Sequence, residues 1–544
     1  MLTVFQARAV AVVALVVALV VGSFYVGTGG VAQEATPHPA GPAVPPELTE
    51  YAADWPARQG NLAGHRANLE SAITADNVGQ LEVAWSFAIE APGVVGGMTA
   101  GPLIAGETVY IQDMQSNVFA LDRASGTVKW EARYDVPTIG PNGVGLGYGM
   151  VYAPLGDTAE VVALNAETGA ELWRVQLSAN PAEGISIAPV AYDNVLYVST
   201  VPGDSEAFYT GGAKGIVYAL DVQTGAVQWQ WDTTTDNLWG NPRINSGGGV
   251  WYPFSFDDEG NIYFGTGNAG PWPGAVVDGT PYPSGASRPG PNDYASSMVS
   301  LDPDTGQLRW HYNANPHDLF DQDFQLTPMI ATVTIDGQER TLAIGGGKNG
   351  KVVAADAGTG EVVWEVEVGQ HNGNAELQEI PEGETIEILP GEFGGIETSM
   401  AYAEGVLFVP VVNLPSQFTS TEFVGHSAGL DGATSELVAL NVADGSVRWT
   451  VEMPTMNVGS ATVANDVVFT SGLDGVFRGY HAETGALLWS YQAGSGFNAP
   501  AAVAGDLVIV PAAGPLIPAP RAEGATPTAI EPAAELIAFR LPAD

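Results

Sequence analysis

The chain has 544 residues, with 61 acidic side chains against 18 basic ones and a formal net charge of −43. Because nucleic acids and anionic membranes are bound through basic patches, this balance argues against either as a partner. Cysteine is absent, which excludes disulfides, thiolate chemistry, iron–sulfur clusters and the Cys-x-x-Cys-His attachment of haem.

The N-terminus predicts an export signal. Arg8 precedes an apolar run over residues 9–21, and the small residues at 30–32 (GVA) suit cleavage. An uncleaved membrane anchor is the alternative, because the apolar stretch can be extended to roughly 18 residues. We therefore expect residues 1–32 to be a signal peptide or membrane anchor and residues 33–50 to be a Pro/Ala-rich linker. The folded part is then exported, to the periplasm, the cell surface or the medium.

One pattern recurs seven times along the chain. Each copy has a β-rich run, a segment similar to Ala-Leu-Asp, a turn that contains Gly, and a short run that ends in Trp, as in Val118–Trp130 (VFALDRASGTVKW). The Asp-x-x-Thr-Gly centre is typical of a hairpin turn in which Gly takes positive φ. We expect the repeat Trp residues to pack between neighbouring sheets. The other copies end at Trp173, Trp229, Trp310, Trp364, Trp449 and Trp489.

Further strand-like runs between the copies bring each unit to about four strands, the size of a propeller blade. An eighth unit is split between the two ends of the chain, at Leu81–Trp85 and Leu536–Leu541. Pairing of these segments would remove exposed sheet edges. We therefore predict an all-β fold over residues 51–544: one eight-bladed β-propeller domain, closed by pairing of the N- and C-terminal strands.

The repeats are unevenly spaced, and the longest intervals carry inserted loops, where functional residues are usually found. The segment 315–323 (NPHDLFDQD) follows Trp310 and belongs to no repeat. Asp321 and Asp323 are two residues apart, so in extended chain they point to the same side and repel unless a cation or a proton lies between them. This favours a metal site or a base tuned by its neighbours. The alternative is a solvated Asx-rich loop, to which Asp318 would also belong.

The repeats and these loops together resemble the pyrroloquinoline quinone (PQQ)-dependent alcohol dehydrogenases, an eight-bladed propeller family, over about residues 55–541. Residues 316–323 (PHDLFDQD) are similar to the family's catalytic segment, with Phe320 in place of the usual Trp. The resemblance implies that Asp321 is the general base that accepts the alcohol proton. It also implies that Asp323 is the extra carboxylate of lanthanide-using members, because a trivalent ion needs more negative oxygen ligands than calcium.

The same resemblance assigns further residues. Residues 265–268 (GTGN) imply that Asn268 is a metal ligand, with Asp321 and Asp323. The acidic ligand that remains is Asp204 by an ungapped count, which we prefer, or Glu206 if the loop is longer. Four residues are expected to contact the cofactor: Trp251 by stacking under the quinone, and Lys348, Ser186 and Asn413 through polar groups.

The sequence departs from the family pattern on the other wall of the cofactor slot. The usual adjacent Cys pair and Arg are absent from residues 140–145 (GPNGVG). Thr99 stands where the family has a Glu, and Val476 stands where it has a cofactor-facing Trp.

Two functions are compatible with these sequence features. The resemblance implies an exported quinoprotein dehydrogenase that oxidises an alcohol by hydride transfer to PQQ bound with calcium or a lanthanide ion, and that passes electrons to a separate acceptor such as a cytochrome. The alternative is a non-catalytic propeller that acts as a binding or assembly scaffold. An enzyme requires the four metal-site residues to converge beside Trp251, whereas a scaffold does not.

Overall fold

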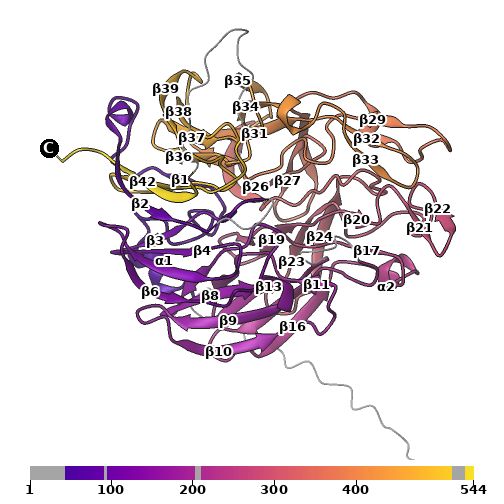
Figure 1. The fold of residues 1–544 in the computed structure, drawn as a ribbon, viewed down its shortest axis with the longest axis horizontal. Helices are drawn as coiled ribbons and strands as arrows, with labels where there is room; N and C mark the ends of the chain where they lie inside the picture. The colour runs from indigo at the N-terminus through magenta and orange to yellow at the C-terminus, as the bar shows by residue number, and fades with distance from the viewer. Residues whose placement is uncertain (1–42, 91–94, 203–209, 518–532, 544) are drawn as a thin grey trace, which may run out of the picture. The chain divides into compact units, whose positions relative to one another are not determined.

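Antiparallel sheets built around the repeat make up most of the fold, which is all-β (Figure 1). The computed structural model describes residues 43–90, 95–202, 210–517 and 533–543, which belong to one unit, Ala40–Asp544. Within these ranges the α-helices are short, α1 (Pro46–Glu50) and α2 (Asp236–Trp239), and none has the length and apolarity that crossing a bilayer requires. The expected signal or anchor, 1–32, lies outside the described residues.

The expected linker over 33–50 ends earlier than the sequence indicates. Its described part includes helix α1, and the Glu47 carboxylate accepts hydrogen bonds from the backbone N–H groups of Tyr148 at 2.9 Å and Gly149 at 2.5 Å. These two N–H groups lie in the turn between strands β7 (Gly145–Gly147) and β8 (Met150–Leu155). The chain is therefore attached to a sheet before residue 50.

The first four sheets each follow the order of the chain. They comprise β3 (Leu103–Ala105), β4 (Thr108–Gln112), β5 (Val118–Asp122) and β6 (Val128–Ala132); β7 (Gly145–Gly147), β8 (Met150–Leu155), β9 (Glu160–Asn165) and β10 (Glu171–Gln176); β12 (Val190–Tyr192), β13 (Val195–Ser199), β15 (Ile216–Asp221) and β16 (Val227–Asp232); and β18 (Ser255–Phe256), β19 (Ile262–Gly265), β23 (Ser297–Leu301) and β24 (Leu308–Asn313).

Three more sheets repeat this arrangement. They comprise β25 (Met329–Ile335), β26 (Gln338–Gly346), β27 (Lys351–Asp356) and β28 (Val362–Glu367); β30 (Ala401–Ala403), β31 (Val406–Asn413), β34 (Thr434–Asn441) and β35 (Val447–Met453); and β36 (Thr462–Ala464), β37 (Val467–Ser471), β38 (Val476–His481) and β39 (Leu487–Gln492), with β1 (Ala67–Asn68) parallel to β36.

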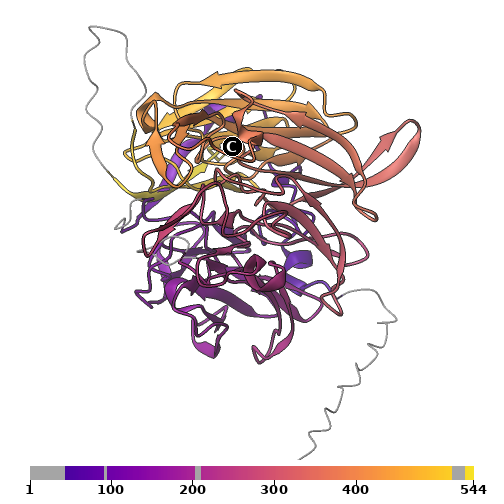
Figure 2. The same ribbon diagram turned by 90° about the vertical axis from the view of Figure 1, so that its right-hand side faces the viewer.

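The N- and C-terminal segments of the described chain share one sheet. Strand β2 (Glu82–Ala88) pairs with β42 (Glu535–Arg540), and β41 (Leu507–Ala512) and β40 (Ala502–Ala504) complete it (Figure 1). The expected pairing between the two ends of the chain is therefore present. Figure 2 shows the twisted strands of successive sheets in a second view.

The repeat Trp residues connect successive sheets, as expected. Trp130 Nε1 donates a hydrogen bond to the carbonyl of Ala166 at 3.0 Å, and a Cβ at Gly169 would lie only 2.6 Å from the Trp130 ring. Gly169 has a φ of +71°. The turn Gly is thus required both by its conformation and by the indole packed against it. The same contact joins Trp85 to Gly126, Trp173 to Gly225, Trp229 to Gly306, Trp310 to Gly360, Trp364 to Gly445, and Trp449 to Gly485.

Small sheets also form in the inserted loops. They are β11 (Glu183–Gly184) with β14 (Val201–Pro202), β17 (Ser246–Gly247) with β20 (Ala269–Gly270), β21 (Ala275–Val277) with β22 (Thr280–Tyr282), and β29 (Ile386–Ile388) with β32 (Ser416–Phe418) and β33 (Phe423–His426).

Candidate active site

A cavity of about 450 Å³ brings together several loops that are far apart in the sequence. Asp321 and Asp323 reach it from the connection between β24 and β25, and Lys348 reaches it from the connection between β26 and β27. Trp251, which precedes β18, forms another part of its wall. Four residues that the sequence singled out therefore line one cavity.

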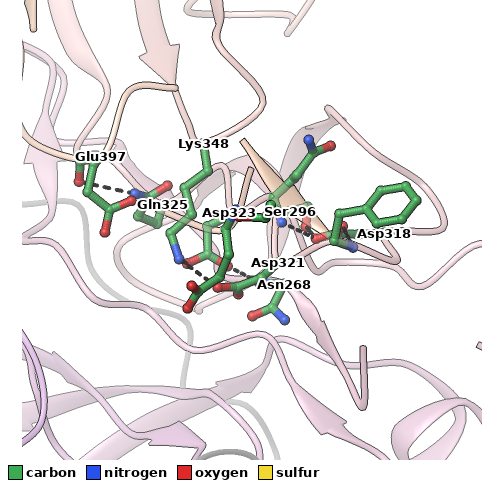
Figure 3. A network of polar contacts seen from close by, with 12 residues as sticks. Asn268, Ser296, Asp318, Asp321, Asp323, Gln325, Lys348 and Glu397 are labelled. Carbon is green, nitrogen blue, oxygen red and sulfur yellow. Dashed lines mark hydrogen bonds and ion pairs between the residues drawn. The ribbon is translucent and has the colours of Figure 1, made fainter. Parts of the chain in front are cut away.

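Lys348 holds the two carboxylates together. Its Nζ lies 3.0 Å from Asp321 Oδ2 and 3.3 Å from Asp323 Oδ2 (Figure 3), and its backbone N–H donates to the carbonyl of Asp323 at 2.8 Å. All three side chains are buried. The expectation that a cation separates Asp321 from Asp323 is thus met by an ammonium group of the chain itself.

Asp321 retains one carboxylate oxygen for a further partner. Its Oδ1 is buried and has no hydrogen-bond partner among the described residues. Burial raises the pKa of Asp321 well above the usual range; the Lys348 ammonium opposes this shift, whereas the Asp323 and Glu392 carboxylates add to it. A carboxylate in this setting suits either a bound cation or the acceptance of a proton.

Asp318 shapes the turn that presents Asp321. Its Oδ1 accepts the N–H of Phe320 at 2.8 Å and its Oδ2 accepts the N–H of Gln322 at 2.7 Å, while Arg288 donates to its backbone carbonyl at 2.5 Å. Burial raises the pKa of the Asp318 carboxyl group to about 6. Asp321 has a φ of +58°, a conformation that non-Gly residues rarely adopt. The Asx-type role considered for this loop therefore holds for Asp318, in a buried rather than a solvated setting.

Asn268 is fully buried beside Asp323. Its backbone N–H donates to Asp323 Oδ1 at 2.5 Å, and its backbone carbonyl accepts the N–H of Gly248 at 2.9 Å (Figure 3). Its side-chain amide nitrogen donates to the carbonyl of Ala269 at 3.4 Å, where β20 begins. The structure thus brings Asn268, Asp321 and Asp323 together, as the metal-site prediction requires.

Trp251 is held by glycines on several sides. A Cβ at Gly267 would lie 2.7 Å from Trp251 Nε1, and a Cβ at Gly140 would lie 2.9 Å from the ring carbons Cε3 and Cζ3. Trp251 Nε1 is buried without a hydrogen-bond partner in the described part of the chain. The residues around position 140 therefore contact the indole directly, because they carry no bulky side chain at this point.

The remaining predicted residues are placed differently. Ser186 lies behind Gly140 rather than on the cavity wall, and its Oγ is 3.0 Å from Thr138 Oγ1. Asn413 does not line the cavity; its amide oxygen accepts the N–H of Gln370 and its amide nitrogen donates to Glu436, both at 2.8 Å. Asp204 and its alternative, Glu206, lie outside the described residues.

The residues present fit a hard metal ion. Two carboxylates and an amide side chain are neighbours, and Asp321 Oδ1 is a buried oxygen that no described donor engages. Calcium and the lanthanides prefer such oxygen donors. Within the described ranges no group of three or more His, Cys, Asp or Glu residues gathers at one point. The third acidic ligand that the sequence predicted, Asp204 or Glu206, lies outside these ranges.

Two carboxylates and several aromatic residues of the cavity wall were not predicted from the sequence. Glu392 and Glu397 line the cavity, and burial raises the pKa of Glu397 to about 7. Trp272, Phe393 and Phe423 line it as well, with 5.7 Å between the ring centroids of Trp272 and Phe423. Most of these residues lie in the long interval between Trp364 and Trp449, so the loop length was the available signal.

Arg58 also lines the cavity and was missed. It lies before the first repeat, in a segment without a recognisable motif. The signal that pointed to Lys348, a rare cation in a very acidic chain, applied to Arg58 equally.

Comparison with known proteins places the chain in a family. Residues 55–145 and 178–380, together more than half of the chain, match the PQQ model described as the β-propeller domain of glucose, ethanol and alcohol dehydrogenases. Residues 393–526 match a model described as outer membrane protein assembly factor BamB.

Similar curated proteins include the quinohemoprotein alcohol dehydrogenase ADH IIB of Pseudomonas putida, 28% identical over 513 residues that cover 82% of this chain and 71% of that protein. They also include the lanthanide-dependent methanol dehydrogenase of Methylacidiphilum fumariolicum, 25% identical over 528 residues that cover 83% of this chain and 82% of that protein.

Solved structures show the same fold. The quinohemoprotein alcohol dehydrogenase from Comamonas testosteroni superposes with a TM-score of 0.74 at 23% identity, covering 91% of this chain and 81% of that one. A europium-containing methanol dehydrogenase superposes with a TM-score of 0.76 at 21% identity, covering 91% and 99%. The chain therefore belongs to the PQQ family of glucose, ethanol and alcohol dehydrogenase β-propellers, a family of oxidoreductases.

Proposed function

We propose that the protein is an exported quinoprotein dehydrogenase that oxidises an alcohol with PQQ and a calcium or lanthanide ion. The observation that carries the proposal is that Lys348 pairs with Asp321 and Asp323, and that Asn268 donates to Asp323, beside a cavity with Trp251 in its wall. The segment with the two aspartates and the loops of Asn268, Lys348 and Trp251 are separate in the sequence, so their meeting is a property of the fold and not of one local motif. The family membership supports the same activity.

We infer that the eight main sheets are the blades of an eight-bladed propeller, closed by the sheet in which β2 pairs with β42. The contact between a repeat Trp and the turn Gly of the next sheet supports this arrangement. A rigid ring of this kind holds the loops that carry the site in fixed relative positions.

The ion, the cofactor and the protein each contribute to the proposed reaction. When bound, PQQ supplies the hydride acceptor, and the ion acts as a Lewis acid on its carbonyl oxygen. Asp321, Asp323 and Asn268, together with Asp204, would hold the ion. The Trp251 indole supports a planar ring by stacking, and the Lys348 ammonium donates to oxygen atoms of the ligand.

Asp321 performs the proton transfer. It lines the cavity and has a carboxylate oxygen that no donor among the described residues engages, and its raised pKa strengthens it as a base. The substrate hydroxyl donates its proton to this oxygen while the hydride leaves the carbinol carbon. Trp272, Phe393 and Phe423 exclude water and contact the alkyl part of the alcohol.

The electrons leave to a separate acceptor, such as a cytochrome. The chain has no cysteine and so cannot attach a haem through Cys-x-x-Cys-His. Export is supported by the apolar run over residues 9–21 and the small residues at 30–32 that suit cleavage. Ser186 and Asn413 remain proposed cofactor contacts of lower weight, because neither lines the cavity.

The scaffold alternative is less well supported. The match to the assembly-factor model covers only residues 393–526, a region of repeats that propellers of many functions share. A scaffold has no requirement for buried carboxylates paired with a buried Lys at one cavity.

The test uses mature protein stripped of metal, to which PQQ is added with calcium or, separately, with lanthanum. We expect uptake of PQQ that depends on the ion, visible in the quinone absorbance, and dye reduction with simple primary alcohols. Asp321→Ala and Asn268→Ala should abolish ion-dependent turnover, whereas the exposed Asp304→Ala should retain it. No uptake with either ion would favour the scaffold.

A further inference from the structure

Arg58 is a buried cation that no anionic side chain among the described residues pairs with. Its side chain lines the cavity and the residue is 7% exposed. Nη2 donates to the carbonyl of Thr99 at a long 3.4 Å, whereas Nε and Nη1 are buried and have no hydrogen-bond partner among the described residues. No carboxylate of the described chain forms an ion pair with it.

The other buried arginines are different. Arg66 donates to the carbonyl of Ala461 at 2.8 Å and to the Thr462 hydroxyl at 2.6 Å, among other acceptors. Arg288 donates to Asn292 and to the carbonyl of Asp318, both at 2.5 Å. Acceptors of the chain itself thus bind the N–H groups of Arg66 and Arg288. Among the buried arginines of the described residues, Arg58 is the exception.

The missing hydrogen-bond partners of Arg58 carry an energetic cost. Removing a guanidinium from water is costly unless its charge and its N–H groups are compensated. Burial lowers the pKa of Arg58 to about 10, so the group remains charged at neutral pH. An anion that enters the cavity would offset this cost, and several N–H donors in a planar fork suit a carboxylate.

The surroundings of Arg58 keep space for its guanidinium. A Cβ at Gly101 would lie 3.3 Å from Nη1, and a Cβ at Gly143 would lie 3.6 Å from Nε. The adjacent segment 140–145 (GPNGVG) carries no basic side chain. Arg58, from a different part of the sequence, therefore supplies the cation of this wall, and Lys348 supplies the second cation of the cavity.

We propose that Arg58 binds a carboxylate group of PQQ. The inference rests on the proposed function, because it assigns one wall of the same site. In a chain with a net charge of −43, a polyanionic ligand needs local cations to overcome the general repulsion. Arg58 and Lys348 provide these from separate loops.

The experiment compares two ligands, PQQ and its trimethyl ester, in which the carboxylates are neutral. Dissociation constants are measured by quenching of tryptophan fluorescence with calcium or lanthanum present, for the wild type and for Arg58→Gln, Arg58→Lys and Arg243→Gln. Arg243 is exposed and controls for the loss of one positive charge.

We expect Arg58→Gln to weaken PQQ binding by about 10- to 100-fold and to change ester binding by less than about 2-fold. Arg58→Lys should be intermediate, and Arg243→Gln should match the wild type. Unchanged PQQ affinity in Arg58→Gln, or equal losses for both ligands, would overturn the assignment.

Thermal unfolding of each variant shows whether it is folded. If Arg58→Gln does not fold, Arg58→Lys is used to test the proposal. The proposal expects a lower ratio of PQQ affinity to ester affinity in Arg58→Lys than in the wild type, and an equal ratio contradicts it. Failure of the wild type to bind PQQ with either ion would instead refute the proposed function, so the two failures are distinguishable.

Discussion

Lys348 and Asp321 form an ion pair of 3.0 Å in the protein interior, with side chains that are 9% and 5% exposed. The same ammonium lies 3.3 Å from Asp323. The protein therefore carries its own counter-charge at the carboxylates that are proposed to bind the metal. This arrangement keeps two buried like charges compatible with folding when no ion is present.

Lys348→Met should destabilise the metal-free protein by about 3–5 kcal/mol, because it leaves Asp321 and Asp323 without a buried cation. Lanthanum or calcium should restore more stability in the variant than in the wild type, because the ion replaces the lost charge. Urea unfolding with chelator and with each ion measures both effects. Lys351→Met is the control, since Lys351 pairs with Glu365 and the exposed Glu376. Equal stability of Lys348→Met and wild type in chelator would contradict the prediction.

Asp323→Ala should change the choice of ion. It removes one of the two described carboxylates, so binding of a trivalent ion should weaken more than binding of calcium. It also removes the acceptor of the Asn268 N–H. Titration of each ion, followed by PQQ uptake, should show at least a tenfold larger loss for lanthanum. A proportional loss for both ions would exclude a special role of Asp323 in ion selection.

Asp318→Ala should loosen the turn that carries Asp321. Two buried N–H groups, those of Phe320 and Gln322, would lose their acceptors, at a cost of about 2–4 kcal/mol in the free energy of unfolding. Asp318→Asn keeps one acceptor oxygen and should lose about half as much. Denaturant unfolding gives the stabilities, and ion titration gives the effect on the site. An Ala variant as stable as the Asn variant would show that these hydrogen bonds do not hold the turn.

Glu397 should make stability depend on pH. Burial raises its pKa from 4.5 to about 7, so between these values the folded protein keeps a proton that the unfolded chain has released. The free energy of unfolding therefore falls as pH rises through this window, and the loss is complete above about pH 7. Glu397→Gln should gain roughly 1–3 kcal/mol at pH 8 and almost nothing at pH 4.5.

Urea unfolding at both pH values checks this prediction, with the exposed Glu387→Gln as the control. Lys348 opposes the shift, whereas Asp323 and Glu392 add to it, so metal-free protein is required. The same gain at both pH values would refute the assignment to Glu397.

Phe423→Ala should alter the preference among alcohols. Phe423 lines the cavity and packs against Trp272, so its removal should lower kcat/KM for benzyl alcohol by about tenfold and for methanol by less than about twofold. Val424→Ala, next to it and 55% exposed, should change neither. Steady-state kinetics with dye reduction provide the measurement. Equal losses for both alcohols would place Phe423 outside the substrate wall.

Local sequence features were enough to predict the sheets and the repeating contact between them. Positive-φ turn glycines, β-branched strands and one Trp per unit are local features, and hydrogen bonding and φ preferences act over a few residues. The terminal sheet followed from the same pattern, because Leu81–Trp85 and Leu536–Leu541 each carry half of a unit. The two-residue spacing also predicted that Asp321 and Asp323 would repel unless a cation or a proton lay between them, and it left a metal, a tuned base and a solvated loop as alternatives.

The groups that meet at the cavity could be identified only from the folded chain. Lys348 supplies the cation between the two carboxylates, Asp318 turns inward to hold the loop, and Asn413 bonds with Gln370 and Glu436 instead of lining the cavity. Arg58 reaches the site from before the first repeat. Such meetings depend on how loops from distant sheets pack together, and no short-range preference along the chain specifies that packing.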